Sequence, residues 1–522
     1  MLTKPLLLLL ACAVWSSAFA EDAPKPRGYA FARFDFEGSQ ALQGWSGGRL
    51  DTGYQGGQSL MLERSTPGSS VATVRLPVEL MRGYTVYGYA MIKAANVSPK
   101  PQPWNGIKFM VPIEGPSGKT WPQAPLDTGS FDWKKASFAM RVPRDATNMT
   151  LVLGLEAVSG QVWFDDVRLV VGKPPVQPPA QPITGPVFRG HNLPRLRGAM
   201  ISPNIDEAGL RTLGREWNAN LIRWQLIRYG PAARLASAAD YDAWLDKELA
   251  RLDAALPLCR QYGLLVALDL HSPWGGKPTV SGYVGSDGDL FTDRACQNHF
   301  VEGWKRIAAR YKDSPVIWGY DLANEPVEGA VAEDCDDWHG LAERAAKAIR
   351  TVDTRHAIIV EANDWGGPDA LGAFRPIDAP GVVYSAHMYV PGAFTHQGVH
   401  QKDGPAYRYP GVIEGSPWDK AALERALAPV VAFQKTWNAA IYIGEFSAIR
   451  WAPDQSAERY LRDVIAIFES HGWDWSYHAF REWSGWSVEH TEDRDDPRPA
   501  ARPTGRQKLL LEWFARNQKP KF

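Results

Sequence analysis

Two glutamates stand out because of the residues beside them. Glu325 lies in an Asn-Glu-Pro sequence and Glu445 in a Gly-Glu-Phe sequence, and 445 − 325 = 120 positions separate them. Each closes a short apolar run of the kind that forms a buried strand. Two facing carboxyl groups can cleave a glycosidic bond with retention: one attacks the anomeric carbon while the other protonates the leaving oxygen. A wider gap, which admits a water molecule between them, would give inversion.

Other polar side chains also close apolar runs in this part of the chain. If the runs are parallel strands of one barrel, their carboxyl ends meet at a single face, where barrel active sites lie. The side chains expected at that face, besides the two glutamates, are Arg223, Asp269, His271, Asn324, Glu361, Asn363, His387 and Tyr389.

The elements that would position these residues occupy residues 188–520. Apolar runs alternate there with helical patterns, such as Asp242–Gln261, which has apolar residues at helical spacing and Gly263 as its stop signal. Continuous apolar strands that alternate with helices predict parallel pairing, and eight of them predict an α/β fold, a (β/α)8 TIM barrel. The eight predicted strands are Leu196–Ile201, Ala219–Trp224, Leu264–Leu270, Val316–Ala323, His356–Glu361, Val382–Tyr389, Ile441–Glu445 and Trp473–Phe480.

The first part of the chain has a different pattern. Residues 28–172 contain short β-type runs separated by Gly and Pro clusters, which predicts an all-β sandwich domain. Six prolines between Lys173 and Pro186 predict an extended linker over residues 173–187. The clearest runs of the predicted sandwich are Val71–Val78, Tyr84–Met91, Met149–Leu155 and Gln161–Val171.

The first twenty residues read as a signal peptide. Lys4 precedes the apolar run Leu6–Trp15, and a small-residue cleavage pattern ends at Ala20. A secreted or periplasmic protein is therefore expected, with lipoprotein anchoring at Cys12 as the alternative. No later run reaches eighteen apolar residues, so no membrane span is predicted.

Three cysteines follow the predicted signal peptide: Cys259, Cys296 and Cys335. In an oxidising compartment an odd number favours one disulfide and one buried thiol. A Cys296–Cys335 pair is expected, because both lie near loops that should emerge on the same face.

The amino-acid composition limits which classes of binding partner are expected. The formal net charge is −1, so there is no basic excess to bind a phosphate backbone, and nucleic acid is not an expected partner. The 22 tryptophans hint at carbohydrate, because flat aromatic faces suit the apolar faces of sugars. In the sandwich, Trp104, Trp121 and Trp133 are either sugar platforms or core and interdomain residues.

Metal and cofactor sites are not predicted. His387, His396 and His400 are loosely spaced in what reads as a long loop, and the acidic run Glu492–Asp496 lacks the spacing of a calcium loop. No Gly-rich phosphate loop precedes a helix, so nucleotide binding is not expected. A monomer that acts on a polysaccharide or oligosaccharide is the expected form.

Residues 190–518 resemble glycoside hydrolase family 5, the cellulase-type (β/α)8 barrels. The matching segments are Leu221–Trp224, Leu268–His271, Leu322–Pro326, Ala386–Tyr389 and Ile443–Ser447. The ends of the first domain, Phe34–Glu37 and Val162–Leu169, resemble jelly-roll, galactose-binding-like modules that bind carbohydrate.

The resemblance to family 5 implies roles for individual residues. Glu325 matches the proton donor, Glu445 the nucleophile, and Asn324 the residue that binds the sugar 2-hydroxyl. Arg223 and Tyr389 match groups that hydrogen-bond the nucleophile. The residues that match the polar lining of the cleavage subsite are His271 and His387.

Strand eight departs from the family pattern. Many relatives carry a Trp there as the floor of the cleavage subsite, whereas this chain has His478, so Trp483 or Trp475 is expected to take that role. The resemblance favours a secreted, retaining β-1,4-glucanase. The open alternatives are a β-mannanase, a β-1,3-glucanase or transglycosylase, and a non-catalytic carbohydrate-binding protein.

Overall fold

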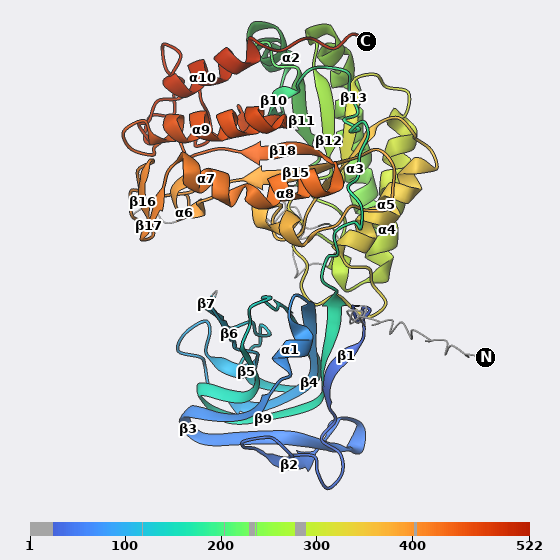
Figure 1. Ribbon diagram of the computed structural model, residues 1–522, viewed down its shortest axis with the longest axis vertical. Helices are drawn as coiled ribbons and strands as arrows, with labels where there is room; N and C mark the ends of the chain where they lie inside the picture. Colours follow the sequence, from blue (N-terminus) through green and yellow to red (C-terminus); the bar gives the residue numbers. More distant parts are fainter. Residues whose placement is uncertain are drawn as a thin grey trace, which may run out of the picture.

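The computed structural model describes residues 24–522, except residues 117, 203, 229–234, 236, 277–288 and 401–403. The predicted signal peptide and most of the insert after His271 lie outside the described residues. Two regions are evident, a β-rich N-terminal domain and a barrel ringed by helices (Figure 1). Within the described part of the chain, no helix is both long and apolar enough to cross a membrane.

The second region is a closed barrel of eight parallel strands in sequence order. Each strand falls within two or three residues of a predicted one, so the predicted α/β barrel is confirmed. The strands are β10 (Arg197–Ile201), β11 (Leu221–Gln225), β12 (Leu265–Asp269), β13 (Ile317–Asp321), β14 (Ala357–Glu361), β15 (Val382–Met388), β18 (Ala440–Phe446) and β19 (Asp474–Phe480).

Alternation along the strands decides which side chains reach the site. Leu221, Ala267, Ile359 and Tyr442 come from different strands yet form one buried cluster, so these positions point into the barrel. Residues two positions further along a strand point the same way. Arg223 of β11, Asp269 of β12 and Glu361 of β14 therefore face inward at the carboxyl ends of their strands.

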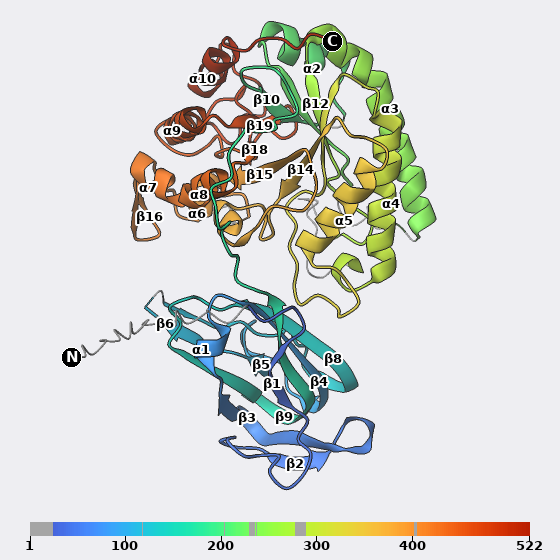
Figure 2. The same ribbon diagram turned by 45° about the vertical axis from the view of Figure 1, so that its right-hand side comes forward.

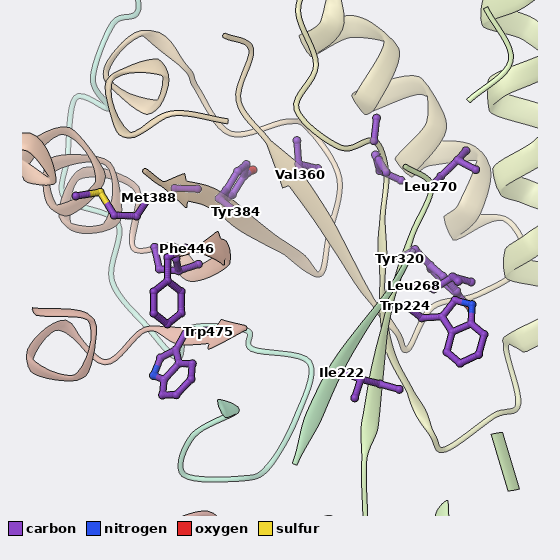
Figure 3. Close-up of a cluster of buried hydrophobic side chains, with 14 of the residues drawn as sticks. Ile222, Trp224, Leu268, Leu270, Tyr320, Val360, Tyr384, Met388, Phe446 and Trp475 are labelled. Carbon is purple, nitrogen blue, oxygen red and sulfur yellow. The ribbon is translucent and has the colours of Figure 1, made fainter. Parts of the chain in front are cut away.

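The intervening positions face outward and pack under helices. Ile222, Trp224, Leu268 and Val360 belong to the large core between strands and helices, part of which Figure 3 shows. The helices are α2 (Glu207–Arg211), α3 (Ala238–Tyr262), α4 (Arg294–Tyr311), α5 (Trp338–Arg350), α6 (Gly392–Thr395), α7 (Lys420–Ala426), α8 (Ala428–Trp437), α9 (Ser456–His471) and α10 (Gly505–Phe514), and a hairpin of β16 (Gly411–Ile413) and β17 (Ser416–Trp418) precedes α7.

The N-terminal domain is an antiparallel β structure around its own apolar core. One correction concerns its last strands: the predicted runs Met149–Leu155 and Gln161–Val171 are one long strand, β9, which pairs with β3, β4 and β5 along its length. The elements are β1 (Ala30–Phe34), β2 (Arg49–Thr52), β3 (Gln58–Arg75), α1 (Val78–Met81), β4 (Thr85–Val97), β5 (Gly106–Met110), β6 (Ile113–Gly115), β7 (Gly118–Thr120), β8 (Gly129–Arg141) and β9 (Asn148–Lys173).

No helix or strand lies between the end of β9 at Lys173 and the start of β10 at Arg197. This segment leaves the N-terminal domain and runs along the barrel, as both ribbon views show (Figure 1, Figure 2). The N-terminal domain and the C-terminus of the chain lie at opposite ends of the molecule (Figure 2).

The predicted disulfide is wrong. None of Cys259, Cys296 and Cys335 forms a disulfide, and all three are buried. Cys259 packs in the apolar core, where burial raises the pKa of its thiol to about 12, and Cys296 lies against the Asp293 carboxylate. Cys296 lies in the first turn of α4, which contacts the segment of Cys335 through the Arg294–Asp336 ion pair at 2.6 Å, but proximity of two segments does not bring two sulfur atoms into bonding geometry.

Reducing agent is accordingly expected to leave the Tm unchanged. A disulfide contributes about 2–4 kcal/mol to stability, so its reduction would lower the Tm by several degrees in a protein of this size. Thermal unfolding with and without a phosphine reductant measures this directly. A clear fall in Tm on reduction would contradict the free-thiol assignment.

Candidate active site

Arg223 is the centre of the polar cluster at the carboxyl end of the barrel. Its side chain is fully buried, and its guanidinium donates hydrogen bonds to Glu445 at 2.5 Å, Asp321 at 2.8 Å and Glu361 at 3.1 Å. Asp269 lies 3.3 Å away. A buried charge persists only when it is paired, so this one cation organises carboxylates from four different strands.

Glu445, at the end of β18, is held as an anion. One of its oxygens accepts the Arg223 hydrogen bond, and the other accepts from the Tyr389 hydroxyl at 2.9 Å. Burial alone would raise the pKa of Glu445, but the nearby charges of His387, His478 and Arg223 outweigh burial and hold it well below its ordinary value. An ionised carboxylate with fixed orientation suits the role of a nucleophile.

Glu325, which follows β13, has the opposite electrostatic setting. Burial raises the pKa of its carboxyl group, and the negative charge of Glu445 adds to that effect. Its backbone N–H donates to Glu361 at 2.9 Å, and a carboxylate oxygen lies 2.9 Å from Nδ1 of His387. A carboxyl group with a raised pKa beside one with a lowered pKa is the division expected of an acid and a nucleophile.

The separation of the two carboxylates distinguishes the stereochemical alternatives. One oxygen of Glu325 and one of Glu445 lie within 4.8 Å of each other, with a ring nitrogen of His387 inside the same limit. Retaining enzymes hold their carboxyl groups about 5–5.5 Å apart, and inverting enzymes about 6.5–9.5 Å. The geometry therefore fits retention.

The same three residues are also the one group among the described residues whose donors could surround a metal ion. The cationic neighbours of Glu445 disfavour a second cation there. His396 packs against Tyr389 and Trp486, and burial lowers its pKa to about 4. His400 is exposed, and within the described part of the chain His387, His396 and His400 do not form a group whose ring nitrogens could surround one ion.

The remaining polar residues predicted for the site also line it. Asn324 is buried, and its side-chain oxygen accepts from Arg223 at 3.1 Å. His271 pairs with Asp269 at 2.6 Å, which offsets the effect of burial and raises its pKa. The ring of His387 lies between Glu325 and Glu361, 3.1 Å from the latter. The structure thus brings together the polar side chains predicted for the site, with one exception: Asn363 lies apart from the Arg223 cluster, where it accepts a hydrogen bond from the backbone of Glu328.

The two tryptophans predicted for the floor of the cleavage subsite have different environments. Trp475 is completely buried, donates to Glu469 at 2.9 Å and packs against Phe446 (Figure 3), so it is not part of the site. Trp483 is 42% exposed and contacts Trp486 edge-on. Trp486, which was not predicted, lies nearer the polar cluster, with ring-centre distances of 5.7 Å to His478 and 6.1 Å to Tyr389.

His478 occupies the position in β19 where many relatives carry a Trp, and it pairs with Glu482. Its Nδ1 hydrogen-bonds Tyr389 and lies 3.5 Å from Glu445, while its Nε2 lies 3.2 Å from Glu482. Burial would lower the pKa of His478, but the two carboxylates outweigh burial and raise it. A histidine with a raised pKa therefore lies beside Glu445 where the family pattern predicts an indole.

Sequence comparison agrees with this geometry. The model of the cellulase family, glycosyl hydrolase family 5, matches residues 181–487, more than half of the chain. The chain belongs to glycosyl hydrolase family 5. The family 5 match begins within the Pro-rich segment and ends just after Trp486, so it includes every polar residue described above.

Individual relatives of this family 5 chain match it over only part of its length. Endoglucanase C of Acetivibrio thermocellus is 30% identical over 259 residues, which cover 44% of this chain and 72% of that protein. Cellodextrinase A of Ruminococcus flavefaciens is 24% identical over 246 residues, 45% of this chain and 68% of that protein. Among solved structures, Thermotoga maritima Cel5A in complex with cellobiose is 26% identical, with a TM-score of 0.46 and coverage of 62% of this chain and 96% of that one.

His478→Gln is expected to move the acidic limb of the kcat/KM profile to higher pH. The charge of His478 helps to lower the pKa of Glu445, so its removal raises that pKa, and ionised nucleophile is then lost at a higher pH. The pH dependence of kcat/KM reports this group in the free enzyme. Glu482→Gln, which removes the partner that favours the charged imidazole, should move the same limb in the same direction but less far. An unchanged or more acidic limb in His478→Gln would contradict the electrostatic role.

Proposed function

We propose that this family 5 protein is a retaining endo-β-glucanase that cleaves β-1,4-linked glucan by double displacement. The observation that carries the proposal is the approach of the Glu325 and Glu445 carboxylates to within 4.8 Å. The family membership supports glycoside hydrolysis, and the similarity to proteins named endoglucanase and cellodextrinase supports a β-glucan substrate.

In the first step, the Glu445 carboxylate attacks the anomeric carbon and forms a glycosyl ester. The bond from that carbon to the leaving oxygen breaks, and the proton of Glu325 passes to this oxygen. In the second step, Glu325 takes a proton from water, the water oxygen attacks the anomeric carbon, and Glu445 leaves. The proton that Glu325 gives up in the first step is replaced in the second, and Glu445 is released as a carboxylate, so the pair is ready for the next cycle.

The residues around Glu325 and Glu445 orient the nucleophile and bind the sugar in these steps. Arg223 and Tyr389 orient the nucleophile through its two oxygens. The Asn324 side chain, fixed by Arg223, is placed to bind the 2-hydroxyl of the sugar, a contact that strengthens as charge develops on the ring. The indoles of Trp486 and Trp483 offer apolar faces beside His478, in the region expected to contact the sugar ring.

The test is release of reducing sugar from a panel of carboxymethyl-cellulose, barley β-glucan, laminarin, glucomannan and galactomannan. The proposal predicts release from the β-1,4-linked glucans and no release by Glu325→Ala. Release from galactomannan or laminarin alone would replace the proposed substrate with mannan or β-1,3-glucan. No release from any member of the panel would contradict the proposed endo-glucanase activity.

A further inference from the structure

The N-terminal domain contacts the barrel at the loop that begins with Glu325. The Tyr89 hydroxyl donates to the carbonyl of Val331 at 2.5 Å, Arg168 pairs with Glu333 at 2.7 Å, and Lys173 pairs with Glu328. Arg27 adds a hydrogen bond to the carbonyl of Cys335 at 2.9 Å. These barrel partners follow Glu325 by only three to ten positions, so the N-terminal domain is attached beside the candidate acid.

A cavity of about 530 Å³ lies between the two domains at this attachment. Its volume is within the range of about 300–1,000 Å³ that is typical of small-molecule sites, which often form between domains. Both domains line it with groups that donate or accept hydrogen bonds. These groups include Arg141, Arg144 and Lys173 of the N-terminal domain and Glu328, Asn363 and Asp364 of the barrel.

A short segment of the barrel joins this cavity to the catalytic pair. Asn363, at the cavity, accepts a hydrogen bond from the backbone of Glu328 at 2.8 Å. Three residues later, the carbonyl of Gly366 accepts from the backbone of His387 at 2.8 Å, and His387 contacts both candidate catalytic glutamates. Trp365 lies between these two points with its side chain 51% exposed.

The cavity lies nearer the loop of Glu325, the candidate acid, than the loop of Glu445. Its barrel walls come from the loops after β13 and β14, and no residue from the loop after β18, which follows Glu445, is among the described residues that line it. Glu325 would protonate the oxygen of the departing sugar, so the leaving-group part of a glycan extends from the acid rather than from the nucleophile. The chain of a bound glycan would therefore run toward this cavity.

We propose that the interdomain cavity binds the leaving-group portion of a neutral β-linked glycan chain, with Trp365 as a stacking platform on the way to it. This rests on the proposed glycanase function. Acidic and basic side chains line the same cavity, together with the Phe374 ring. Hydroxyl groups can donate and accept, so a neutral sugar satisfies both kinds of charge, whereas an anionic ligand would meet Glu328 and Asp364. The N-terminal domain thereby completes the cleft at its own edge, independently of the exposed Trp104 and Trp121 on its surface.

The kinetic test compares a long substrate with a short one. Arg144→Ala, Asp364→Ala and Trp365→Ala each alter an exposed side chain, so the fold should survive. Each is expected to lower kcat/KM for cellohexaose by about tenfold, the loss of one charged hydrogen bond or ring contact. Hydrolysis of an aryl cellobioside, which has no sugar on the leaving side, should stay within twofold. Arg75→Ala, an exposed arginine on β3 of the same domain, is the matched control and should change neither substrate.

A binding measurement separates this proposal from the proposed function. Calorimetric titration of the full chain carrying Glu445→Gln with cellohexaose is expected to show binding that Arg144→Ala weakens about tenfold. Binding without hydrolysis by the unaltered protein would refute the glycanase and leave the site standing. Three results would overturn the site. They are equal losses of kcat/KM on the long and short substrates, undiminished binding of cellohexaose in Arg144→Ala, and binding only of an anionic oligosaccharide such as oligogalacturonate.

Discussion

Glu445→Ala is expected to lower kcat by about 10⁴-fold or more on every substrate, because no other described carboxylate can form the covalent intermediate. Asp269, Asp321 and Glu361 also pair with Arg223, but their side chains are completely buried, whereas Glu445 keeps a small exposed surface. Kinetics on an aryl cellobioside measure the loss. Added azide should partly restore turnover by entering the space of the missing carboxylate, and the product should be the α-glycosyl azide.

Two further variants make that prediction specific. Glu445→Gln keeps an oxygen to accept from Arg223 and an amide near Tyr389, so it should fold normally and remain inactive. Glu414→Gln changes an exposed glutamate of the β16–β17 hairpin and should have full activity. Substantial activity in Glu445→Gln, or azide rescue that yields a β-product, would show that another group is the nucleophile.

Glu325→Ala is expected to lower kcat by about 10²–10⁴-fold on oligosaccharides, whose leaving oxygen needs a proton. The same variant should form the glycosyl intermediate almost normally from a dinitrophenyl cellobioside, because that leaving group departs unprotonated. Stopped-flow detection of the dinitrophenolate burst measures this step separately. The basic limb of the kcat/KM profile of the unaltered protein, set by the raised pKa of Glu325, should be absent in the variant with the activated substrate.

The contrast between leaving groups is the decisive part of the Glu325 result. A residue that only maintains the structure would slow both substrates alike. Asp369→Asn, an exposed acidic residue in the segment after β14, is a control that should leave both rates unchanged. Equal slowing of the oligosaccharide and the dinitrophenyl substrate by Glu325→Ala would exclude its role as the proton donor.

Most of the barrel and its polar centre could be predicted from the sequence because strand periodicity locates strand ends. The inward direction of Arg223 follows from the alternation of Leu221 and Ile222, and the Asn-Glu-Pro and Gly-Glu-Phe sequences mark two strand ends directly. Glu361 was also placed at a strand end, yet its role as the shared partner of Glu325 and Arg223 depends on cross-barrel contacts that a linear pattern does not contain.

The residues that sequence reasoning missed come mainly from irregular segments. Glu482 and Trp486 follow β19 in a stretch without regular spacing, so nothing predicted which of the nearby tryptophans would approach His478. The sequence also offers Trp475 for that position, but strand alternation turns it outward against Phe514. The Cys296–Cys335 error has a related origin, because the direction of each side chain, from α4 and from the segment before α5, decides sulfur geometry. The interdomain cavity depends on how the N-terminal domain packs against the barrel. The sequence patterns that predict each domain do not specify that packing.

The central claim is that the Glu325 and Glu445 carboxylates act as a retaining pair. Proton NMR during the first minutes of cellohexaose hydrolysis tests it most directly, because the anomeric signal of the new reducing end appears before mutarotation. The account predicts that the β-anomer appears first and the α-anomer grows in later. Initial release of the α-anomer would show inversion and would contradict the double-displacement mechanism.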